Sequence, residues 1–170
     1  RSRLTLLLIT AAGLCLGLFV QAQTVARSMG VTVDAKAGVY VGSDVQARID
    51  SVNETPERFP LPLTRAVRRL QAGELRPAVP FDLLAIDTET FASTAFWDPA
   101  FSPEPLETLL DGLSGPSDET LPVVMASAPN AFPDSITIDQ TTVPIEIVGR
   151  ANAFPGMTSI RPLVVVDEQR

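Results

Sequence analysis

Residues 4–26 form an apolar run without one charged side chain, and Arg1 and Arg3 stand directly before it. A helix needs roughly 20 apolar residues to cross the hydrocarbon core of a bilayer, which is about 30 Å thick. The core helix of a soluble domain is usually shorter and carries a polar stripe, whereas this run is apolar on all sides. The run therefore predicts either a transmembrane helix or a signal peptide.

These two alternatives differ in what remains of the run in the mature protein. The basic start and the small residues around Ala22 fit a signal peptide that is cleaved after Ala22. The run is long for a signal peptide, however, and the chain opens on Arg rather than Met, so we expect that residues precede Arg1. We therefore expect a retained transmembrane helix over residues 1–26, followed by one domain over residues 27–170.

The distribution of charge indicates an orientation and a compartment. Two arginines precede the run and only Arg27 follows it, so the N-terminal side is expected to be cytoplasmic and the residues after about Arg27 extracytoplasmic, at the plasma membrane. From Arg27 onward there are 11 basic and 20 acidic side chains, a net charge of −9. This charge argues against binding to nucleic acid or to an anionic membrane surface. The same part contains no cysteine, so it has no disulfide framework.

Short apolar or alternating runs, separated by turn residues, dominate the chain after Arg27, which is typical of β-strands. Alternating stretches with a central polar turn predict hairpins, and short apolar runs predict single strands. The last run is apolar throughout and is expected to be buried on both faces. The predicted hairpins span residues 35–50 and 135–154, and the predicted single strands span residues 80–87, 121–128 and 161–167.

One short helix is predicted within residues 103–115, where four leucines follow helical spacing, with proline at the start and glycine past the end. Residues 61–75 are ambiguous. Leu63, Val67 and Leu70 fit one face of a helix that Gly73 would cap, but residues 64–70 also fit an edge strand paired with residues 80–87. The predicted fold class is α+β, with an N-terminal transmembrane helix followed by a mostly β domain with one or two short helices.

Candidate catalytic residues are few. The chain has no histidine, which excludes Ser-His-Asp triads, Cys-His pairs and histidine metal ligands, and its only thiol, Cys15, lies in the apolar run. Asp87 and Glu89 suit a glycosidase pair or a calcium site, but a solvated turn is the simpler interpretation. We therefore expect no enzymatic activity, no cofactor and no metal.

Two groups of side chains are candidates for contacts with a partner. Arg65, Arg68, Arg69 and Arg76 form a basic run that would suit an acidic partner, although a solvated face is the default interpretation. Residues 91–101 include the only tryptophan of the chain, and these aromatic side chains either pack in the core or form an exposed ledge. The residues singled out for a partner contact are Phe96, Trp97 and Phe101.

The order of these pieces resembles the extracytoplasmic part of FtsX-like ABC transporter permeases, the group that includes the MacB-type periplasmic core domain. The resemblance covers the chain from Leu4 to Asp167, and its most specific pieces are LLAIDTETF (residues 83–91) and TVPIEIVGRANAFPGM (residues 142–157). It implies that residues 64–87 form a pair of strands.

The resemblance also implies a function in the bacterial cell membrane. It implies a cytoplasmic ABC ATPase as partner, further transmembrane helices after Arg170, and a permease dimer. Energy from nucleotide binding would pass across the membrane as movement of helices (mechanotransmission) and serve export or cell-envelope work. The alternative is a secreted or membrane-anchored binding or structural module cleaved after Ala22, and an enzyme that acts through carboxylates alone is the remaining hypothesis.

Overall fold

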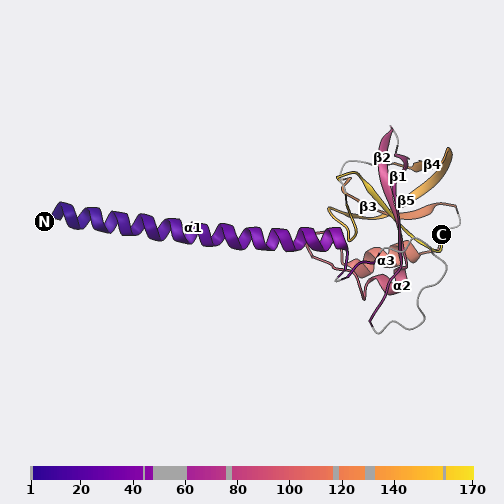
Figure 1. Ribbon diagram of the computed structural model, residues 1–170. Coiled ribbons are helices and arrows are strands. Elements are labelled where there is room, and N and C mark those ends of the chain that lie inside the picture. The colour runs from indigo at the N-terminus through magenta and orange to yellow at the C-terminus, as the bar shows by residue number, and fades with distance from the viewer. Residues whose placement is uncertain are drawn as a thin grey trace. The chain divides into compact units, whose positions relative to one another are not determined.

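The computed structural model, shown in Figure 1, describes residues 2–43, 45–47, 61–75, 78–116, 119–128, 133–158 and 160–170. The chain divides into two compact units, Arg1–Ala37 and Gly38–Arg170. We refer to the first as the helical unit and to the second as the barrel unit. The apolar run at residues 4–26 lies entirely within the helical unit.

The helix α1 spans Ser2–Val41. Its part up to Ala37 makes up the helical unit, and its last residues, from Gly38 onward, belong to the barrel unit. The predicted helix is confirmed, but α1 continues past Ala26 as far as Val41. The predicted hairpin at residues 35–50 is wrong, because residues 35–41 are helical, and residues 48–50 lie outside the described residues. Extending an existing helix by one residue costs little free energy, because the unfavourable nucleation step is already complete. An alternating pattern directly after a helix can therefore remain helical.

Within the described residues, the barrel unit contains a closed barrel of six strands and two short helices, and this confirms the strand-rich α+β domain. Neighbouring strands follow the order β1-β2-β6-β3-β5-β4. The elements are β1 (Ala66–Leu75), β2 (Val79–Ile86), α2 (Thr88–Phe91), α3 (Leu106–Ser114), β3 (Leu121–Ala126), β4 (Ser135–Ile138), β5 (Thr141–Ala151) and β6 (Leu163–Asp167). Each of the three predicted single strands, the hairpin at residues 135–154 and the helix at residues 103–115 is therefore present.

The ambiguous segment is the strand β1, which pairs antiparallel with β2 from Ala66 opposite Ile86 to Leu75 opposite Val79. Its C-terminal end also pairs with β4 and closes the barrel. Gly73 is a point of close approach at this closure and not a helix cap, because a Cβ at this position would overlap the carbonyl oxygen of Thr137.

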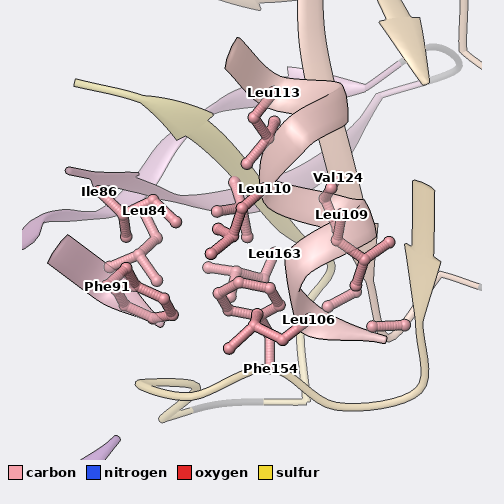
Figure 2. Packing of buried hydrophobic residues seen from close by; sticks show 13 residues of the cluster. Leu84, Ile86, Phe91, Leu106, Leu109, Leu110, Leu113, Val124, Phe154 and Leu163 are labelled. Atoms are coloured by element: carbon pink, nitrogen blue, oxygen red, sulfur yellow. The ribbon is translucent and has the colours of Figure 1, made fainter. Parts of the chain in front are cut away.

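Two clusters of buried apolar side chains lie on opposite sides of the strands, as expected when successive residues of a strand point to opposite faces. One cluster receives side chains from all six strands and fills the barrel. We refer to the other as the helix-side cluster. It joins α2 and α3 to the outer face of the sheet, and Figure 2 shows the leucines of α3 packed beside Phe91 and Phe154. All five residues of β6 are buried, which confirms the prediction for the last strand.

Candidate functional site

The last turn of α1 is hydrogen-bonded into the barrel unit. Gly42 has a φ of +82°, the left-handed conformation in which glycine often ends a helix. Its N–H donates to the Gly38 carbonyl over 2.7 Å. The carbonyl of Val39, which has no partner within the helix, accepts the N–H of Gly156 over 2.7 Å, and the Gly42 carbonyl accepts the N–H of Phe96 over 2.9 Å. Three backbone hydrogen bonds thus hold the chain where it leaves α1.

The ring of Phe96 completes this arrangement. A Cβ on Gly38 would overlap three atoms of the Phe96 ring, so the ring lies directly on the backbone of α1. A further β-bridge joins Ser43 to Ala95, the residue before Phe96. We refer to Gly38, Val39, Gly42, Phe96 and Gly156 as the helix socket; all five belong to the barrel unit.

A series of aromatic contacts leads from the helix socket into the helix-side cluster. The ring of Phe96 lies 5.9 Å from that of Phe101, which meets Trp97 edge-on at 5.6 Å. Trp97 meets Phe154 edge-on at 5.9 Å, and Phe154 stacks on Phe91 at 5.6 Å. These centroid distances are those of interacting rings. We refer to the five residues as the aromatic row.

The three residues proposed for a partner contact therefore do not form one exposed ledge. Phe101 is only 5% exposed and belongs to the packed interior. Trp97 is half-buried and packs against the helix-side cluster, and Phe96 is half-buried on Gly38. Phe96 and Trp97 are partly exposed, so a contact with an external partner stays a prediction for these two residues.

The carboxylate of Asp87 caps a helix. Asp87 is the N-cap of α2, since its Oδ1 accepts the N–H of Glu89 over 3.1 Å and its Oδ2 accepts the hydroxyl of Thr90 over 2.7 Å. Such a cap satisfies backbone donors that a helix start leaves unpaired. Among the described residues, no group of three His, Cys, Asp or Glu side chains is placed to hold a metal ion.

The basic run is divided among separate contacts. The guanidinium of Arg69 donates to both carboxylate oxygens of Asp139, over 2.9 and 2.8 Å. Arg65 Nε lies 3.3 Å from Glu168 Oε2, an ion pair whose alignment is not that of a hydrogen bond. Arg76 lies outside the described residues. Of the three arginines of the run that the structure describes, Arg65 and Arg69 are therefore each paired with a separate carboxylate.

Arg68 lies apart from these pairs, in a narrow crevice beside Gly156 of the helix socket that Asp82 and Arg161 also line. Asp82 is 3% exposed, and its Oδ1 accepts hydrogen bonds from Arg161 Nε over 3.0 Å and from the Gln71 N–H over 2.9 Å. Arg68 Nε is buried without a hydrogen-bond partner. Burial lowers the pKa of Arg68 from its ordinary value, and the nearby side chains of Tyr40 and Asp82 act in the opposite direction.

The Arg69–Asp139 pair predicts a pH-dependent contribution to stability. The hydrogen bond from Arg69, and secondly its charge, lower the pKa of Asp139 from its ordinary value. The stabilisation is therefore present above the unfolded pKa and is lost as the pH falls through the lower, folded pKa. Both side chains are largely exposed, so we expect a small effect. Asp139→Asn should lower the urea midpoint slightly at pH 7 and hardly at all once the pH lies below both pKa values.

The matched measurement is urea unfolding of the wild-type chain and Asp139→Asn, in detergent, at neutral and acid pH. Asp139 has a φ of +47°, which asparagine also tolerates, so the turn itself is retained in the variant. A difference in midpoint that stays constant across the pH range would contradict the assignment.

The sequence analysis missed the helix socket and the buried Asp82. A usable signal was present for the socket, since Gly38 and Gly42 are four positions apart at the end of a helical stretch. No local signal marks Asp82, whose partner Arg161 is 79 residues away. A comparison with protein families, with curated proteins and with solved structures finds no match to this chain in any of the three. Its function is therefore inferred from its own residues.

Proposed function

We propose that this chain is a membrane-anchored extracytoplasmic domain, and that it is the exterior part of an FtsX-like ABC permease subunit. The observation that carries the proposal is the extent of α1. The stretch Leu7–Val41 is long and apolar enough to cross a membrane, and the last turn of the same helix is bonded into the barrel unit through the helix socket.

The architecture suits a domain that responds to movement of its N-terminal helix. An α-helix rises about 1.5 Å per residue with all interior hydrogen bonds made within it, so a displacement of its backbone reaches its end. In the proposed permease, a cytoplasmic ABC ATPase moves the membrane helices, and α1 delivers the movement to the barrel unit. This transfer of movement is the mechanotransmission expected from the family resemblance. Further transmembrane helices and a second permease copy complete the proposed assembly.

The second candidate is a secreted or membrane-anchored binding or structural module cleaved after Ala22. A signal sequence meets the same criteria of length and composition as an anchor, and Ala22 lies in the exposed middle of α1. The candidates differ in the mature N-terminus and in the retention of the protein by membranes.

The test is N-terminal sequencing and topology mapping of protein extracted from membranes. We expect a mature chain that begins upstream of Gln23 and stays in the membrane pellet at alkaline pH. In a Cys15→Ser background, Glu107→Cys places a thiol at an exposed position of α3, and an impermeant maleimide should label it in intact cells. A soluble chain beginning at Gln23, or a thiol labelled only after lysis, would overturn the anchored orientation.

The permease assignment has its own readout in the same membranes. A nucleotide-binding subunit should co-purify with the full-length protein and hydrolyse ATP. Retained protein that is free of any such subunit would contradict the permease and leave the anchored domain standing.

A further inference from the structure

The contact between Gly38 and Phe96 differs from the other contacts of the helix socket. The hydrogen bonds of the socket join backbone atoms only, at the carbonyls of Gly38, Val39 and Gly42. The contact at Gly38 instead brings a ring against bare backbone, with no space for even one methyl group between them. The position of the Phe96 ring therefore depends on where the last turn of α1 lies.

The Phe96 ring is also the first member of the aromatic row. Its neighbour Phe101 is 5% exposed, and Phe154, two contacts further along the row, is fully buried. A packed interior has few voids, so a ring that moves must displace its neighbours. The row ends at Phe91 in α2, within the cluster that also holds α3.

We propose that Phe96 is a positioning residue that passes a displacement of the last turn of α1 to Trp97 and from there to the packing under α2 and α3. This inference rests on the proposed function, in which α1 moves. It names the contact at which the barrel unit responds to that movement, and it assigns to Phe96 an intramolecular role.

The test adds one methyl group at Gly38 and observes Trp97, the only tryptophan of the chain. In the full-length chain in detergent, Gly38→Ala should push the Phe96 ring and shift the fluorescence emission of Trp97. It should also raise the hydrogen-exchange rates of the Gly42, Phe96 and Gly156 amides by about tenfold or more, which corresponds to roughly 1.4 kcal/mol of local stability.

The matched control is Gly30→Ala, the same substitution in the same helix. Nothing lies within 4 Å of a Cβ at Gly30, and both substitutions improve helix propensity equally. Gly30→Ala should leave the Trp97 emission and the three amides unchanged. If Gly38→Ala behaves like Gly30→Ala, the proposal is overturned.

A second variant keeps the test decisive if Gly38→Ala perturbs the whole domain. Phe96→Val shortens the opposing side chain, so Gly38→Ala/Phe96→Val should bring the three exchange rates back to within about threefold of wild type. A double variant that is as perturbed as Gly38→Ala alone would show that the damage does not pass through Phe96, and would overturn the proposal.

Failure of this proposal and failure of the proposed function are distinguishable. A chain cleaved after Ala22 retains residues 38–42 and Trp97, so the fluorescence and exchange comparison applies to it unchanged. A mature N-terminus at Gln23 would refute the membrane anchor without altering the result at Gly38, and an unresponsive Trp97 would refute the contact without altering the anchor.

Discussion

Replacement of Asp82 by alanine is expected to destabilise the barrel unit by about 3 kcal/mol, because it removes a buried carboxylate that accepts a charged hydrogen bond from the partly exposed Arg161 and another from a backbone N–H. Asp82 accepts hydrogen bonds from Arg161 and from the Gln71 N–H, and its side chain is only 5% exposed. Gln71 has a φ of +49° at the irregular part of β1, where the pairing with β2 shifts register. The loss of Asp82 therefore removes the acceptor that holds this irregularity.

The measurement is urea unfolding followed by circular dichroism, with Asp111→Ala as the control. Asp111 is an exposed residue of α3, and its removal should change the stability by less than about 0.5 kcal/mol. Asp82→Asn retains an acceptor oxygen for the Gln71 N–H and should lose less stability than Asp82→Ala. Equal stability of Asp82→Ala and Asp111→Ala would contradict the structural role assigned to Asp82.

Phe154→Ala is expected to have the largest effect of all, a loss of about 3–5 kcal/mol. Phe154 is fully buried, stacks on Phe91 and meets Trp97 edge-on, so its truncation opens a cavity where the aromatic row enters the helix-side cluster. A typical domain is stable by only about 5–15 kcal/mol, so this variant should lose a large share of the stability of the domain.

Two graded variants check the assignment by circular dichroism. Phe154→Leu fills part of the space and should cost clearly less than Phe154→Ala. Phe96→Ala removes a half-buried ring at the start of the row and should also cost less, because fewer buried contacts are lost. If Phe96→Ala destabilises the domain as much as Phe154→Ala, Phe96 serves mainly the core, and the distinction drawn between the two ends of the row is wrong.

The elements that could be predicted were those whose signal is local. The leucines at 106, 109, 110 and 113 follow helical spacing, and all four are buried in α3. Residues 135–154, with their alternating pattern, contain both strands of a hairpin and the turn between them. The strand Ser135–Ile138 pairs with residues 141–144 of β5. In both segments the periodicity of apolar residues matches one kind of element only, so the local sequence was sufficient to predict the helix and the hairpin.

In residues 61–75 the local sequence did not distinguish a helix from a strand. The spacing of Leu63, Val67 and Leu70 suits a helix, but β1 is a strand because both β2 and β4 supply backbone partners from other parts of the chain. At residues 35–41 the opposite happened. The alternating pattern suited a strand, yet the chain stays helical, and the partners of this last turn, Phe96 and Gly156, come from distant parts of the sequence.

The candidate site followed the same division. The sequence showed that residues 91–101 include four aromatic side chains and that the chain carries no histidine, and these facts were sufficient to direct attention to Phe96, Trp97 and Phe101. Whether each ring is buried depends on which distant residues cover it, and Gly38 and Phe154 do so from opposite ends of the row. Composition and periodicity therefore established the apolar helix, α3 and most strands, because those signals lie within one segment. The helix socket, the closure of the barrel at Gly73 and the burial of Asp82 required the folded chain, because each depends on a contact between segments that no local pattern encodes.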